Sequence, residues 1–112
     1  MELRHFDRVR LLVQEAIDHL TALGSHDELA LIPVFIDTAQ SLEIRANNRS
    51  SAILLIHAAN RRIACAEKQT IARIIGDQDV SMNEMSHLVR VRLICAEISN
   101  LLDDGLEEIR HT

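Results

Sequence analysis

Histidine and glutamate side chains are the residues of this chain whose types and spacing could do chemistry. His57 follows four branched aliphatic residues and precedes Arg61 and Arg62. A histidine in this setting can accept a phosphoryl group, bind a metal ion or lie at the boundary between a helix core and solvent. A second pattern, Glu-x-x-His, occurs three times, as Glu2 to His5, Glu84 to His87 and Glu108 to His111. The surrounding residues and the predicted helix positions distinguish between these possibilities.

The turn around His57 resembles that of histidine phosphotransfer domains, which are helical bundles with a boundary histidine and basic residues nearby. In that family a lysine usually stands three residues after the histidine and a glycine four residues after it. Asn60 and Arg61 occupy these places here, and a bulky Arg61 fills the space that the glycine clears for an incoming receiver domain. We therefore interpret His57 as a boundary histidine and keep a phosphorelay function as the alternative.

The Glu-x-x-His spacing is the one by which ferritin-like bundles hold two metal ions from one face of a helix. All three pairs lie at or near the ends of predicted helices, whereas a bundle site needs such pairs at mid-helix. Glu15 and His19, one turn apart, more often form a weak ion pair than a metal site. A metal-binding bundle is thus a second alternative, and we expect no metal and no cofactor. No glycine-rich phosphate loop or nucleophile motif occurs, so we also expect that the protein is not an enzyme.

The composition predicts helices. Hydrophobic residues make up 47% of the 112 residues, aromatic residues 2%, and there are 3 Gly and 1 Pro. Straight-chain and small residues favour helices, and the turn residues that sheets require are scarce. Periodic apolar residues predict helices over about 3–23, 33–46, 50–75 and 82 to near the carboxyl end. We expect one all-α domain over residues 1–112, an antiparallel bundle of four main helices.

The start of the second helix has two interpretations. Ser25-His-Asp-Glu28 has the sequence of a capping box, but Pro33 lies about two turns further on. A proline there removes a helical hydrogen bond, so the helix is broken or kinked near Pro33. We favour a short turn over residues 25–32 that precedes a main helix with Pro33 in its first turn.

Three other helix ends have local sequence signals. Gly24 and Gly76 are placed to end the first and third helices, and Asn47 tolerates the left-handed conformation that ends the second. Ser81-Met-Asn-Glu84 is a capping box that predicts the start of the fourth helix.

The charge is segregated along the chain. Residues 1–48 carry four Arg and eight acids, residues 49–75 carry five cations and one acid, and residues 76–112 carry three Arg and eight acids. The simplest interpretation is that the cationic third helix pairs with its neighbours inside the bundle. The functional interpretation is a basic stripe that binds an acidic partner protein. Its residues are His57, Arg61, Arg62 and Lys68.

The long helices also carry apolar residues away from their main faces. On the fourth helix these form a strip of Val89, Leu93 and Ala96, and a small monomer has little reason to make a helix apolar on two sides. Asn60 and Glu67 fall within the core-facing arc of the third helix. These polar side chains either pair across a specific helix–helix contact or are hydrated at an opening of the bundle.

These observations lead to a functional expectation. The net charge of −5 opposes binding to nucleic acid or to an anionic membrane, and no 18-residue uncharged run is present. Two cysteines without a Cys-x-x-Cys pair fit reduced thiols in the cytoplasm. We expect a homodimer that binds another protein, as an adaptor, a chaperone or a regulator that sequesters a partner such as a transcription factor, by analogy with other small helical proteins.

Overall fold

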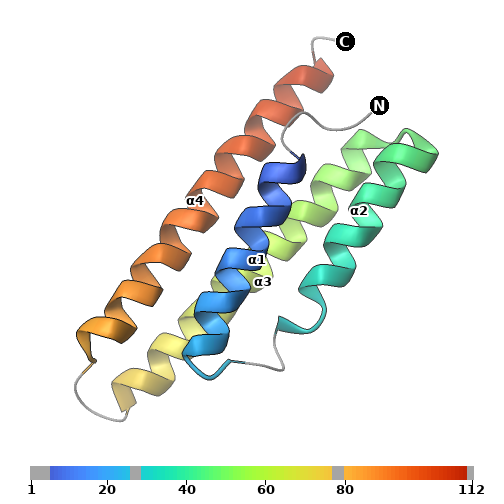
Figure 1. Cartoon of the computed structure of the whole chain (residues 1–112). Helices are drawn as coiled ribbons and strands as arrows, with labels where there is room; N and C mark the ends of the chain where they lie inside the picture. Colours follow the sequence, from blue (N-terminus) through green and yellow to red (C-terminus); the bar gives the residue numbers. More distant parts are fainter. Residues whose placement is uncertain (1–5, 26–28, 77–79, 111–112) are drawn as a thin grey trace.

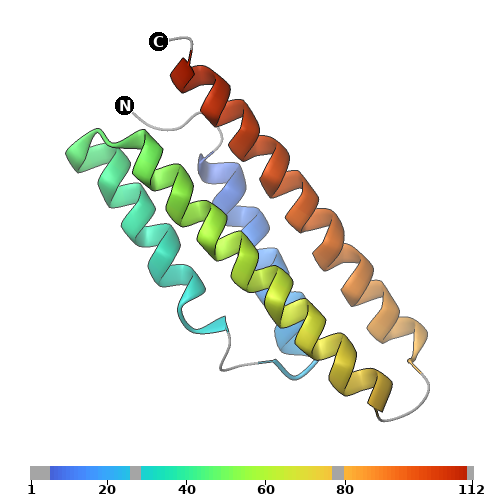
Figure 2. The same cartoon turned by 180° about the vertical axis from the view of Figure 1, so that it is seen from behind.

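Helices form the whole framework of the described chain. The computed structural model describes residues 6–25, 29–76 and 80–110. Within these residues the helices are α1 (Phe6–Ala22), α2 (Ile32–Ala46), α3 (Arg49–Gly76) and α4 (Met82–Arg110). Successive helices run in opposite directions, and the two long ones, α3 and α4, lie along one another (Figures 1 and 2). The predicted all-α antiparallel bundle is confirmed.

The contacts between helices place α3 at the centre of the arrangement. It packs against α2 on one side and α4 on the other, and it also contacts α1, which lies mainly against α4. The molecule is elongated, with extents of 51 × 23 × 17 Å. This shape follows from the length of α3 and α4, because 28 and 29 residues at about 1.5 Å per residue span about 42 Å.

Aliphatic side chains from all four helices fill the core. The helical spacing of α3 predicts a core face of seven aliphatic residues, of which Ile71 is only partly buried. The buried ones are Ile53, Ile56, Ala59, Ile63, Ala66 and Ile74. Their spacing of three and four residues keeps them on one side of the helix. The facing helices contribute Val9, Leu12, Val13, Ala16, Leu20, Ile32, Ile36, Ala39, Val91, Ile94, Ile98 and Leu102.

The helix ends follow the predicted local signals. Gly24, beyond the end of α1, has φ +90°, and Asn47, at the end of α2, has φ 50° and ψ 39°. Both values lie in the left-handed region. The capping box before α4 is also confirmed. The Ser81 amide donates to Glu84 Oε1 at 3.0 Å, and the Glu84 amide donates to Ser81 Oγ at 3.1 Å.

The approach to α2 agrees with the alternative that we favoured. The main helix begins at Ile32 and has Pro33 in its first turn, where the missing amide hydrogen costs no helical hydrogen bond. Glu28 of the predicted capping box lies outside the described residues. Ser25 is buried, and its hydroxyl bonds to Thr70 Oγ1 of α3 at 2.6 Å, so its side chain links the end of α1 to α3.

None of the helices in the described ranges is long and apolar enough to span a membrane.

Candidate functional site

The helix α4 is apolar on two opposite sides. Leu88, Val91 and Ile98 are buried, while Val89 and Leu93 are 51% and 56% exposed. At 3.6 residues per turn the exposed residues lie opposite the buried ones. We define the α4 strip as the exposed residues Met82, Met85, Val89, Leu93 and Ala96. The strip predicted from the sequence is therefore at the surface, and it extends further toward the start of the helix.

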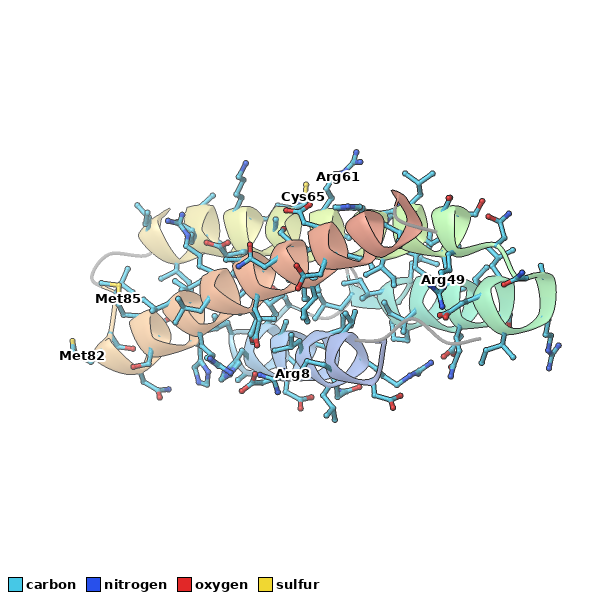
Figure 3. The ribbon with its side chains drawn as sticks, turned by 90° about the horizontal axis from the view of Figure 1, so that it is seen from above. Arg8, Arg49, Arg61, Cys65, Met82 and Met85 are labelled. Carbon is cyan, nitrogen blue, oxygen red and sulfur yellow. The ribbon has the colours of Figure 1, made fainter. Side chains whose placement is uncertain are left out.

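The outer side of α3 carries the predicted basic residues. His57 is half-buried, in keeping with a position at the edge of the core, and Arg61 and Lys68 are exposed. Arg61 and Cys65 project away from the bundle (Figure 3). Neither Arg61 nor Lys68 has an ion pair or a hydrogen bond with another side chain in the described part of the chain. Both cations therefore face solvent.

Arg62 belongs to a different side of α3. Its guanidinium lies 5.2 Å from the centre of the Phe35 ring on α2, a distance at which the cation is attracted to the aromatic face. Arg61 and Arg62 line, with Cys65 and Gln69, a groove of about 390 Å³. The structure thus keeps His57, Arg61 and Lys68 together on α3 and directs Arg62 toward α2, away from the α4 strip.

Two other cations of α3, Arg73 and Arg49, contact groups elsewhere in the bundle. The guanidinium of Arg73 donates to the carbonyl of Gly24 at 3.3 Å and also to that of Leu23. These contacts cap the carboxyl end of α1. Arg49 Nε lies 3.9 Å from Oε1 of Glu43, a carboxylate that is buried on α2. Internal contacts therefore involve part of the positive charge of α3, while Arg61, Arg62 and Lys68 are exposed to solvent.

Asn60 and Glu67 specify the contact between α3 and α4. They are only 8% and 5% exposed. Asn60 Nδ2 donates to the carbonyl of Cys95 at 3.2 Å and to Ser99 Oγ at 3.1 Å. Glu67 Oε1 accepts a 2.7 Å bond from Arg92 Nε. Of the two interpretations from the sequence, the helix–helix contact is the correct one, and it lies within one chain.

A cavity of about 310 Å³ opens beside Glu67, near the carboxyl end of α3 and the start of α4. Seven aliphatic or methionine side chains line it, with the ion pair of Glu67 and Arg92 as its polar part. The apolar lining residues are Ile71, Ile74, Ile75, Val80, Met85, Leu88 and Val89. Two residues of the α4 strip, Met85 and Val89, therefore also line the cavity.

Close to this cavity, on the seam of α3 and α4, lies the thiol of Cys95. Burial raises the pKa of this thiol to about 11, and the nearby Glu67 carboxylate contributes in the same direction. A thiol held in its neutral form is a poor nucleophile and a poor metal ligand at neutral pH. Cys65, in contrast, is exposed on the outer side of α3.

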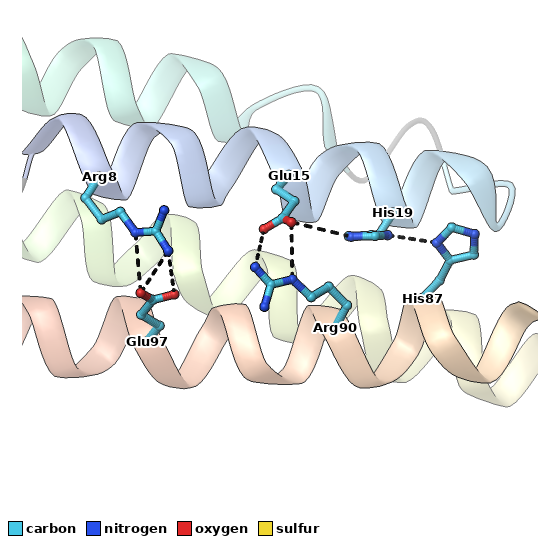
Figure 4. A network of polar contacts seen from close by, with 6 residues as sticks. All are labelled: Arg8, Glu15, His19, His87, Arg90 and Glu97. Atoms are coloured by element: carbon cyan, nitrogen blue, oxygen red, sulfur yellow. Dashed lines mark hydrogen bonds and ion pairs between the residues drawn. The ribbon is translucent and has the colours of Figure 1, made fainter.

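Two ion pairs join α1 to α4 along a polar seam (Figure 4). Arg8 and Glu97 approach to 3.0 Å, and Arg90 contacts both carboxylate oxygens of Glu15, at 2.8 and 3.2 Å. The hydrogen bond from Arg90 lowers the pKa of Glu15, and the same contact raises the pKa of Arg90. Sequence reasoning missed these pairs because their members stand 75 and 89 positions apart.

The same seam holds a pair of histidines. The Nδ1 atoms of His19 and His87 are 2.8 Å apart, and Glu15 Oε1 lies 4.0 Å from the other ring nitrogen of His19. A hydrogen bond between two imidazoles needs a proton on one Nδ1 and a lone pair on the other. His87 therefore contacts α1, while Glu84, its partner in the Glu-x-x-His pattern, is part of the helix cap.

The other two Glu-x-x-His pairs include His5 and His111, which lie outside the described residues. Among the residues that are described, no group of three or more His, Cys, Asp or Glu side chains is arranged to hold a metal ion.

The fold and these contacts define the class of the protein as an antiparallel four-helix bundle with a polar α1–α4 seam and an exposed apolar strip on α4. Comparisons with protein-family models, with curated proteins and with solved structures each found no match.

Proposed function

We propose that this protein acts without catalysis, by binding another polypeptide, and that it does so as a homodimer. The observation that carries the proposal is the α4 strip, an apolar surface on the side of α4 opposite its buried face. A helix that only has to pack into its own bundle needs one apolar side. A second apolar side on a helix of 29 residues favours a contact with another chain.

A second copy of the chain is a suitable partner for the α4 strip. Two-fold pairing brings the same surface of each subunit together, so an apolar strip meets an apolar strip. Val89 and Leu93 lie in the amino-terminal half of α4, and two α4 helices that cross there would cover both residues.

The exposed cations of α3 suit a different, acidic partner. Arg61 and Lys68 project from the outer side of α3 and are not engaged within the described residues. Complementary charge orients an approaching protein and raises the rate of association. In this proposal the dimer is an adaptor, a chaperone or a regulator that sequesters a partner such as a transcription factor in the cytoplasm.

The test uses a photo-reactive amino acid at position 93, introduced into the protein in its native cells. Leu11, an equally exposed leucine on α1, serves as the matched control position. We expect crosslinks from position 93 to a second copy of the chain and none from position 11. The double variant Val89→Glu/Leu93→Glu should be monomeric by light scattering, while Leu11→Glu stays dimeric. A wild-type protein that is monomeric at cellular concentration and gives no crosslink from position 93 contradicts the dimer.

The partner contact is tested separately. A photo-reactive amino acid at position 68 should crosslink to a second polypeptide, and the added substitution Arg61→Glu should abolish this crosslink without changing the mass of the dimer. Arg45→Glu, which reverses an exposed arginine at the end of α2, is the control and should leave the crosslink intact. A crosslink that survives Arg61→Glu unchanged contradicts a role of this charge in partner binding.

A further inference from the structure

The cavity between α3 and α4 has the features of a binding site for a small amphiphile. Its volume of about 310 Å³ is at the lower end of the range of about 300 to 1,000 Å³ for ligand pockets. Such pockets are mostly apolar and have a few polar groups that fix the orientation of the ligand. Here the apolar walls come from both helices, with Ile71 and Ile75 on α3 facing Met85 and Val89 on α4. Met85 lies on the first turns of α4 (Figure 3).

The polar group that a ligand can reach is the guanidinium of Arg92. Its Nε is committed to Glu67 at 2.7 Å, but the side chain is 70% exposed. Within the described residues its two Nη groups make no hydrogen bond. A guanidinium presents its donors as a rigid, planar fork that matches a carboxylate. Arg92 can therefore hold Glu67 with Nε and a second carboxylate with its outer edge.

The charge of the ligand follows from the burial of Glu67. A cationic ligand would have to displace Arg92 from a carboxylate that is 5% exposed, and leaving a buried charge without its partner is strongly unfavourable. An anionic ligand leaves the ion pair of Glu67 and Arg92 intact. A carboxylate is thus favoured over an ammonium group.

We propose that this cavity binds an unbranched aliphatic carboxylate, with the chain between α3 and α4 and the carboxylate on the outer edge of Arg92. The volume sets the length of the chain. A water-sized group occupies about 30 Å³, and a methylene group is of similar size, so a cavity of about 310 Å³ holds about ten carbons. Each added methylene should tighten binding about fourfold until the cavity is full.

The experiment is an amide NMR titration of the full chain with sodium hexanoate, octanoate and decanoate, each below its micelle-forming concentration. Decan-1-ol and decylammonium are the matched neutral and cationic probes. The titration is run on the wild type and on Leu93→Glu, which interrupts the α4 strip outside the cavity lining, so that a second copy covering the opening does not hide the site. We expect saturable shifts at Ile71, Ile75 and Val89, and an affinity that rises with chain length.

The role of Arg92 is tested by substitution. Arg92→Gln should weaken decanoate binding at least tenfold and leave decan-1-ol binding unchanged, while Arg61→Gln, the control, should alter neither. Because Arg92→Gln leaves Glu67 without its partner, the double variant Glu67→Gln/Arg92→Gln removes both charges and should also lose the preference for the carboxylate. Equal binding of decanoate, decan-1-ol and decylammonium, an unchanged affinity in the Arg92 variants, or shifts that map elsewhere would overturn the proposal. None of these results depends on the dimer, which is measured by light scattering in the same samples.

Discussion

The hydrogen bond between Ser25 and Thr70 allows a quantitative test of how the end of α1 is held against α3. Both residues are 2% exposed. Thr70 Oγ1 donates to the carbonyl of Ala66 at 2.7 Å, so its hydrogen is already used, and Ser25 must be the donor in the 2.6 Å bond between the two hydroxyls. The two residues are therefore not equivalent.

This asymmetry predicts unequal effects of two substitutions. Ser25→Ala removes one hydrogen bond and leaves Thr70 bonded to Ala66, so it should lower the free energy of unfolding by about 1 kcal/mol. Thr70→Val also removes that bond but leaves the Ser25 hydroxyl buried without a partner, so it should lower the free energy by about 2 kcal/mol. The double variant leaves no unpaired hydroxyl and should lose about 1.5 kcal/mol, which gives a coupling of about 1.5 kcal/mol.

The assay is urea unfolding followed by far-ultraviolet circular dichroism, since the chain contains no Trp or Tyr for fluorescence. The slope of the free energy against urea should be the same for all four proteins. Two results would refute the reasoning. One is an additive double variant, with a coupling below about 0.3 kcal/mol, and the other is a larger loss for Ser25→Ala than for Thr70→Val.

Four further predictions concern single residues. In thermal melts, Gly24→Ala should lower stability by about 1 to 2 kcal/mol, because Gly24 has φ +90° and such a backbone is strained for alanine. The control Gly76→Ala, where an added Cβ meets nothing within 4 Å, should not lower stability. Ser81→Ala should lower the melting stability by about 1 kcal/mol through loss of the capping box before α4; an unchanged melt would contradict the cap. A thiol reagent at pH 8 should modify Cys65 first, because the pKa of Cys95 is raised to about 11. Because the pKa of Cys95 is raised from the ordinary thiol value of 9.0 to about 11 in the folded state, the unfolded thiol loses its proton first as the pH rises. Stability should therefore fall between about pH 9 and pH 11, and Cys95→Ala should reduce this effect.

The helices and their ends could be predicted from the sequence because their signals are local. Gly24, Asn47 and the capping box of Ser81 and Glu84 each act within a few residues of the backbone that they terminate. The buried faces follow from apolar spacing along a single helix. The position of Pro33 in the first turn of α2 follows from an equally local reason, because the missing amide hydrogen of proline costs a hydrogen bond inside a helix but not in its first turn.

The contacts between helices could not be predicted in the same way. The spacing along α1 shows that Glu15 and His19 share a face, and the spacing along α4 places Arg90 and His87 near one another. Nothing in either segment shows that the two faces meet. Ser25 is the clearest case, because its local sequence resembles a cap whereas the fold uses its hydroxyl to reach Thr70, 45 positions away. Such a partner depends on how helices rotate against each other, which periodicity along one helix leaves open.

The polar contacts of α4 select which of its two apolar sides is buried. Turning α4 about its axis so that Val89 and Leu93 faced the core would separate Arg90 from Glu15 and would remove the carbonyl of Cys95 from Asn60. Exposed ion pairs add little to stability on their own, but in the alternative rotation the buried Asn60 would lose both hydrogen bonds that it makes to α4, and Glu67 would lose Arg92. Unpaired buried polar groups are expensive. The same groups that join α4 to α1 and α3 therefore keep the α4 strip at the surface, and Asn60→Leu, which removes one of these penalties, should weaken the preference of α4 for the observed rotation.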